Sequence, residues 1–142
     1  MQSENEHSVV EALYRLNTLN QGHVLAKLRE LSLTIHQARS LQFIAEHPAT
    51  SQKHLADYLG KQDATVTNLV KVLEQRDLVS RAVVAGNERQ KAVSLTTKGQ
   101  ALVVKIHGIF QHRETAVEQL LSQPERHQLL TLLKRLTVEL NA

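Results

Sequence analysis

Apolar residues recur every three or four positions along most of the chain, and this spacing predicts helices. The first repeat predicts a long amphipathic helix over residues 9–30, weakened around Gly22 by the polar stretch NQGH. A second helix is expected to begin after Thr34, whose hydroxyl can cap it. This helix should end at His47, because the residue before Pro48 is disfavoured in helical backbone.

Two short helices are expected next, joined at Gly60. Ser51 can cap the first of them, and Gly60 can adopt the left-handed backbone at its end. The second helix should cover about residues 63–76, with Gln62 or Asp63 at its start. Its apolar residues form one buried stripe, namely Val66, Leu69, Val70 and Leu73.

The spacing of these two helices is that of a helix-turn-helix. Ala56, four residues before Gly60, is small enough for the helices to cross closely. Val66 and Leu69, six and nine residues after the glycine, can hold the second helix against the first. A purely structural helical corner satisfies the same spacing, so the outward surface of the second helix decides between the two interpretations.

That outward surface is polar and carries no acidic side chain. Asparagine can pair with adenine, threonine with thymine and other base edges, and lysine with guanine or phosphate. The surface therefore has the chemistry of a major-groove reader. Its residues are Ala64, Thr65, Thr67, Asn68, Lys71 and Gln75.

After Asp77 the apolar period changes from 3.6 to 2, which predicts a two-stranded hairpin over about residues 78–95. The segment AGNE between the strands predicts a turn, since glycine and asparagine accept positive φ. One face of the hairpin should carry Val79, Val83, Val93 and Leu95.

A hairpin directly after a helix-turn-helix is a wing. Arg89 and Lys91 near its tip can reach an adjacent minor groove or its phosphates. Charges at a hairpin also keep an edge strand from aggregating, and this role alone would account for Lys91.

Two further helices are expected, from Lys98 to about Leu121 and from Pro124 onward. The last one has an apolar band too wide for a single contact surface, which favours burial against a second copy of the chain. Its members are Leu129, Leu130, Leu132, Leu133, Leu136, Val138 and Leu140.

Composition narrows the function classes. The chain has no cysteine, no glycine-rich phosphate loop and no clustered catalytic or metal-ligand motif, and His107 and His112 are five residues apart. We therefore predict no enzyme activity, cofactor or metal site. Apolar runs stay well short of about 18 residues, so no membrane span is expected and the predicted location is cytoplasmic.

Positive charge is concentrated in the centre of the chain. Residues 51–99 contain eight basic and five acidic side chains, which equals the whole net charge of +3. A polyanion is the simplest partner for this segment.

The segments HLADYLGKQDATVTNLVKVLEQRDLVSR and NERQKAVSLTTKGQAL resemble the MarR family of winged helix-turn-helix transcription regulators. The family's Asp-x-Arg wing motif is Asn87-Glu88-Arg89 here, so the arginine is kept and the aspartate is replaced. Asp77 stands where relatives often have glycine, and Asn68 where they often have arginine.

The resemblance implies a mainly α fold with a β-hairpin wing and helical dimerisation arms. The arms would be residues 1–32 and 98–142, and the winged helix-turn-helix would be residues 33–97. Within it, the recognition helix is expected at about 63–76 and the wing at about 78–95.

The resemblance also implies a bacterial homodimer, typically with intertwined first and last helices, that binds double-stranded DNA in a sequence-specific way and acts as a repressor. A twofold dimer would place the recognition helices about 34 Å apart on a near-palindromic operator. The predicted DNA contacts are Ser51, Gln52, Lys53, Ala64, Thr65, Thr67, Asn68, Lys71, Arg76, Arg89 and Lys91.

Many relatives are released from DNA by a small lipophilic compound or aromatic acid. The corresponding crevice here would be lined by Leu19, His23, Ile35, His36 and Arg39. The alternative function is a winged-helix module that binds other proteins, for which an apolar or acidic recognition surface is expected.

Overall fold

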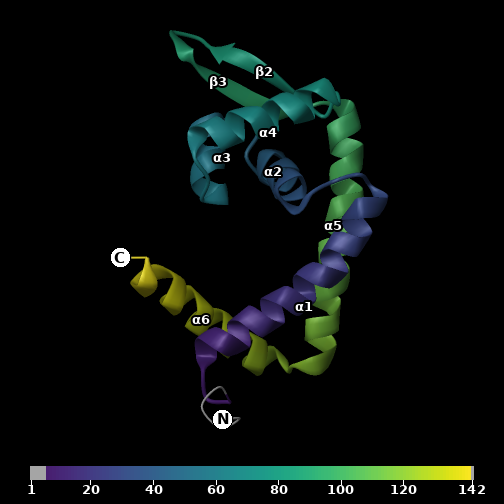
Figure 1. Ribbon diagram of the computed structural model, residues 1–142, viewed down its shortest axis with the longest axis vertical. Coiled ribbons are helices and arrows are strands. Elements are labelled where there is room, and N and C mark those ends of the chain that lie inside the picture. The colour runs from purple at the N-terminus through teal and green to yellow at the C-terminus, as the bar shows by residue number, and fades with distance from the viewer. Residues whose placement is uncertain (1–5, 142) are drawn as a thin grey trace. The chain divides into compact units, whose positions relative to one another are not determined.

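The structure is a computed structural model that describes residues 6–141, with the side chains of residues 87–89 outside the described part. The chain forms two compact units, Met1–Ile109 and Phe110–Ala142. The elements are α1 (Val9–Glu30), α2 (Ile35–Glu46), β1 (Thr50–Ser51), α3 (Gln52–Leu59), α4 (Asp63–Gln75), β2 (Val79–Val84), β3 (Asn87–Leu95), α5 (Thr97–Leu120) and α6 (Gln123–Leu140), shown in Figure 1.

Local capping chemistry sets the helix ends. Thr34 forms a capping box with Gln37 at the start of α2, and Ser51 caps α3 by accepting a hydrogen bond from the His54 N–H. Both caps confirm the sequence prediction. Helix α1 has the predicted bounds, Val9–Glu30, and runs without a break through Gly22.

Helices α3 and α4 form the predicted helix-turn-helix. Gly60 has φ 64° and ψ 33°, and its N–H donates to the carbonyl of Asp57 at 3.3 Å. Leu55 and Ala56 of α3 are buried. On α4 the buried stripe is Val66, Val70 and Leu73, whereas Leu69 is only half-buried, which corrects the prediction for that residue.

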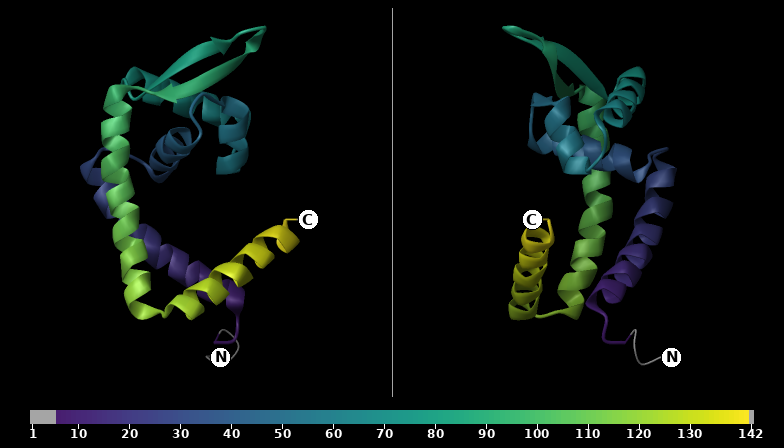
Figure 2. Two further views of the ribbon diagram at one scale, coloured as in Figure 1. Left: turned by 180° about the vertical axis from the view of Figure 1, so that it is seen from behind. Right: turned by 60° about the vertical axis from the view of Figure 1, so that its left-hand side comes forward.

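The sheet has three antiparallel strands in the order β1-β3-β2, not the two that were predicted. Thr50 of β1 pairs with Val93 of β3, and on the other side Val93 pairs with Arg81 of β2. Val79 and Val93 are buried, but Val83 is 58% exposed, although it was expected on the apolar face. Val83 lies in the outer part of the hairpin, which projects past α3 and α4 (Figure 2).

The base of the hairpin is tied to α4 and α5. Asp77 has φ 60°, in agreement with its position at a helix exit where left-handed backbone is needed. The Thr96 hydroxyl donates to the Asp77 carbonyl at 2.6 Å. Gly99 is buried so closely that a Cβ atom there would overlap the carbonyl oxygen of Leu78.

One aliphatic core fills the first unit. It is built from the second half of α1, helices α2 to α4, the base of the sheet and the first half of α5. Its largest fully buried side chains include Leu28, Leu41, Ile44, Leu55, Leu73, Leu78 and Ile106. By contrast, α6 in the second unit has no buried residue. No helix in the described residues is both long and apolar enough to cross a bilayer.

Candidate nucleic-acid interface

Helix α4 exposes the polar surface that the sequence predicted. Ala64, Thr65, Asn68 and Lys71 are exposed, and Thr67 is half-exposed. The opposite side of the helix is fixed by burial of its apolar stripe, so these side chains are presented on a helix that has little freedom to rotate.

The start of α3 adds three of the predicted contact residues. Lys53 is exposed, whereas Ser51 and Gln52 are half-buried. The Ser51 hydroxyl is engaged as the helix cap, 3.1 Å from the His54 nitrogen. Only Lys53 therefore offers an exposed charge at this point.

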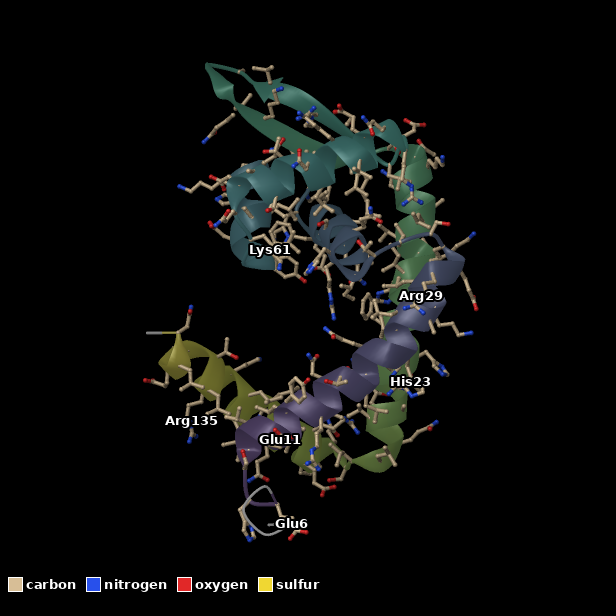
Figure 3. All side chains as sticks on the ribbon, viewed as in Figure 1. Glu6, Glu11, His23, Arg29, Lys61 and Arg135 are labelled. Carbon is tan, nitrogen blue, oxygen red and sulfur yellow. The ribbon has the colours of Figure 1, made fainter. Side chains whose placement is uncertain are left out.

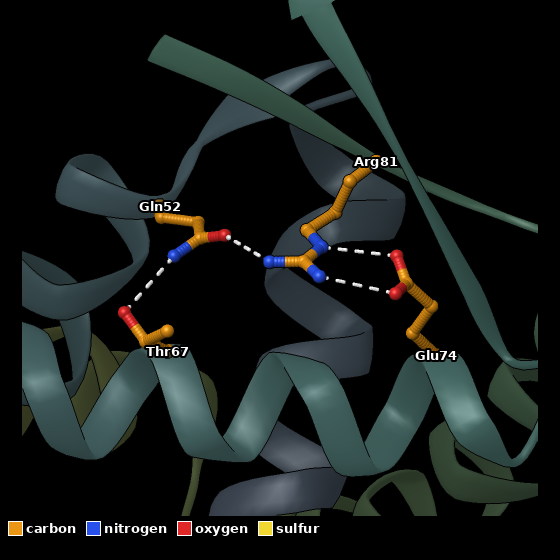
Figure 4. A network of polar contacts seen from close by, with 4 residues as sticks. All are labelled: Gln52, Thr67, Glu74 and Arg81. Carbon is orange, nitrogen blue, oxygen red and sulfur yellow. Dashed lines mark hydrogen bonds and ion pairs between the residues drawn. The ribbon is translucent and has the colours of Figure 1, made fainter. Parts of the chain in front are cut away.

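Gln52 belongs to a polar network that joins α3, α4 and β2 (Figure 4). Its amide nitrogen donates to the Thr67 hydroxyl at 3.3 Å, and its amide oxygen accepts from Nη1 of Arg81 at 3.4 Å. Arg81 also donates through Nε and Nη2 to the two carboxylate oxygens of Glu74, at 2.9 and 3.1 Å. The network is a direct polar link from the wing to the recognition helix.

The Arg81–Glu74 ion pair changes the electrostatics of this surface. Hydrogen bonding by Arg81 lowers the pKa of the Glu74 carboxyl, and the same pair raises the pKa of Arg81. The Arg81 side chain is 16% exposed and that of Glu74 is 40% exposed. The one acidic side chain on the carboxyl-terminal half of α4 is therefore paired with a cation.

Arg81 was missed by the sequence analysis. The available signal was its position between Val79 and Val83, where alternation of the strand predicts an inward side chain. A charged residue at such a position requires a partner, and Glu74 provides it.

Arg76, one of the predicted DNA contacts, is hydrogen-bonded within the chain. Its guanidinium donates to the carbonyl of Ser32 at 2.8 Å and to that of Leu31 at 3.5 Å. These contacts tie the end of α4 to the segment that follows α1. We therefore assign Arg76 to the support of α4 and leave it out of the proposed DNA contacts.

The wing carries the remaining basic residues. Lys91 of β3 is exposed and pairs with Val83, while the side chain of Arg89 lies outside the described part of the chain. Gly86 has φ 84°, which confirms the expected left-handed backbone at the tip.

The structure places the five predicted effector residues in different environments. Leu19 and His23 are exposed on α1, and Ile35 and Arg39 are half-buried on α2. His36 lines a cavity of about 360 Å³, whose other walls are Thr34, Gln37, Leu59, Lys61, Thr65, Val66, Asn68, Leu69 and Val72. Figure 3 labels Lys61 beside α3, and His23 apart from it on α1.

A second hollow, of about 770 Å³, is lined by residues of α2, α3 and the sheet, with no residue of α4. Phe43 stacks there on His47 and Tyr58, at centroid distances of 4.2 and 4.6 Å. Sequence analysis did not predict this aromatic cluster. In residues 6–141, no group of three His, Asp or Glu side chains is arranged to hold a metal ion.

Two mycobacterial proteins are similar to this chain. They are the HTH-type transcriptional repressors Rv2887 of Mycobacterium tuberculosis and Mb2911 of Mycobacterium bovis. Each is 23% identical over 124 residues, which cover 87% of this chain and 89% of the relative.

Solved structures of S. aureus MepR are also similar. The MepR–DNA complex has a TM-score of 0.85 with 26% identity, over 93% of this chain and 98% of MepR. MepR in its DNA-binding conformation has a TM-score of 0.84 with 28% identity, over 94% and 99%. The family model described as MarR family matches residues 31–90, which include the whole helix-turn-helix and most of the wing. Residues 31–90 of this chain therefore match the MarR family, and the fold over more than nine-tenths of the chain is similar to that of S. aureus MepR.

Proposed function

We propose that this chain is a homodimeric repressor that places α4 in the major groove of double-stranded DNA and its wing at the neighbouring minor groove. The observation that carries the proposal is the exposed, non-acidic surface of Thr65, Asn68 and Lys71 on a helix fixed by its buried side. The solved complex of the similar S. aureus MepR with DNA supports the same use of the fold.

Each group on α4 has a defined task in this proposal. Asn68 pairs with an adenine edge, and Lys71 binds guanine or phosphate. The pairing of Glu74 with Arg81 supports approach of a polyanion, because it reduces repulsion near the carboxyl-terminal half of the helix. Lys53 at the start of α3 binds backbone phosphate, which positions the helix without reading sequence.

The wing adds a second point of contact. Arg89 inserts toward the minor groove and Lys91 binds phosphate, where a narrow groove concentrates negative potential. The link from β2 to α4 through Arg81 supports a fixed angle between the two contact elements.

The exposed leucines of α6 support a homodimer. Leu129, Leu130 and Leu132 are each at least 41% exposed, and Leu136 is 37% exposed. Burial of the remaining exposed part of each such side chain against a second copy stabilises the dimer by about 0.5–1.5 kcal/mol. Two copies of α4 then bind half-sites about ten base pairs apart.

We also propose that a small molecule releases the chain from DNA. The cavity beside His36 has mainly apolar walls and the cationic Lys61, a combination suited to a lipophilic or aromatic acid. Because Thr65 and Asn68 also line it, a ligand there would bias the position of α4 and weaken DNA binding.

The proposal is tested by selecting bound sequences from random duplexes with the full chain. We expect an inverted repeat, bound at least about 10³-fold more tightly than a scrambled duplex of equal length at the same salt concentration. Equal binding of the two duplexes would contradict sequence-specific recognition, and no binding of either would favour a protein partner.

A further inference from the structure

The polar network around Gln52 has a fixed direction, because arginine donates hydrogen bonds and cannot accept them. Nη1 of Arg81 lies 3.4 Å from Oε1 of Gln52, so this oxygen is the acceptor. The amide nitrogen of Gln52 must then face Thr67, and it donates to the Thr67 hydroxyl oxygen at 3.3 Å.

The hydroxyl proton of Thr67 is also committed. Oγ1 of Thr67 lies 2.9 Å from the carbonyl oxygen of Asp63, one helical turn earlier, and donates to it. Since a hydroxyl has a single proton, Thr67 has none left for an acceptor on a base. The methyl group of the half-exposed Thr67 side chain remains available for an apolar contact.

Thr67 lies at the fifth position of α4, within the amino-terminal part of a recognition helix that usually touches bases. In the major groove, the 5-methyl group of thymine is the apolar feature that distinguishes this base.

We propose that Thr67 is a specificity-determining residue whose γ-methyl group contacts the 5-methyl group of a thymine, with Gln52 and Arg81 as positioning residues that keep its hydroxyl turned to Asp63. The inference rests on the proposed DNA-binding function. It departs from the simpler expectation that a threonine on a recognition helix reads bases through its hydroxyl.

The test uses the full-length chain and the duplex that it selects from random sequences. Each thymine of a half-site is replaced in turn by uracil, which lacks only the 5-methyl group. Binding is measured for the native chain, for Thr67→Val, which keeps the methyl group, and for Thr67→Ser, which keeps the hydroxyl. Thr131→Ser is the matched control, because this exposed threonine of α6 also donates its hydroxyl proton to the carbonyl one helical turn earlier.

We expect one thymine per half-site at which uracil weakens native binding by about fourfold, the factor expected for burial of one methyl group. The loss should persist in Thr67→Val and in Thr131→Ser and disappear in Thr67→Ser. The inference is overturned if Thr67→Ser keeps the uracil effect, if Thr67→Val abolishes it, or if no thymine is sensitive. A native chain that selects no sequence overturns the proposed function itself, so the two failures are distinguishable.

Discussion

The guanidinium of Arg81 donates two hydrogen bonds to the carboxylate of Glu74, with N···O distances of 2.9 and 3.1 Å, and so connects strand β2 to helix α4. Bidentate pairs of this kind restrict orientation as well as distance. In a winged helix-turn-helix the two connected elements are those that the proposed function brings to neighbouring grooves. The connection between strand β2 and helix α4 therefore depends on the ionisation of Glu74, which can be measured.

Stability should depend on pH through this pair. The pKa of Glu74 is held below its ordinary value of 4.5, chiefly by its hydrogen bonds from Arg81. The pair's contribution is therefore complete above pH 4.5 and is lost as the pH falls through the folded-state pKa. We expect Glu74→Gln to lower the melting temperature near neutral pH, with a gap to the native chain that narrows in acid. In an Arg81→Met background the gap should not depend on pH, and a pH-independent gap in the native background would refute the assignment.

Arg89 of the wing should strengthen DNA binding through its charge, without affecting which bases are preferred. We expect Arg89→Ala to reduce the slope of log K against log salt concentration by about two per dimer, one counterion for each wing. The base preference of the selected duplex should stay the same. Lys134→Ala, on an exposed position of α6, is the control and should leave the slope unchanged. An unchanged slope for Arg89→Ala would remove the wing from the interface.

The exposed leucine band of α6 should be an interface between two copies. Leu136→Asp is expected to convert the dimer to a monomer, because it puts a charge into a surface that association removes from water. Sedimentation equilibrium measures the change. His127→Asp lies about half a turn from Leu136 by the helical repeat and should leave the dimer intact. A dimer that survives Leu136→Asp would exclude this surface.

Substitution by alanine at two helical glycines should change the stability of the fold in opposite directions. Gly99→Ala is expected to destabilise the fold by about 1–3 kcal/mol, since its Cβ would overlap the Leu78 carbonyl. Gly22→Ala meets no atom within 4 Å and should stabilise by about 0.5–1 kcal/mol. Chemical denaturation checks both values. Equal effects at the two positions would contradict the close approach at Gly99.

The parts of the fold that the sequence predicted are those set by local chemistry. Thr34 and Ser51 cap helices through residues three positions away, and Gly60 ends α3 through its own backbone freedom. Strand β1 was not predicted, because a strand of two residues is too short to show an alternating apolar pattern. Its pairing partners also lie more than 40 positions later in the chain.

The same limit applies to the candidate site. The exposed surface of α4 follows from its helical repeat, so Asn68 and Lys71 were placed correctly as solvent-facing residues. The partners of Arg76 and Arg81 are set by tertiary packing, which one sequence does not reveal. Both arginines therefore had to be assigned from the structure.

The most direct test of base reading by α4 is a comparison of the sequences selected by the native chain and by Asn68→Ala. The account predicts that the variant loses preference at one base position in each half-site, by about 1–3 kcal/mol, while its other preferences and its salt dependence stay the same. Identical preferences for the two chains would contradict recognition through the exposed surface of α4.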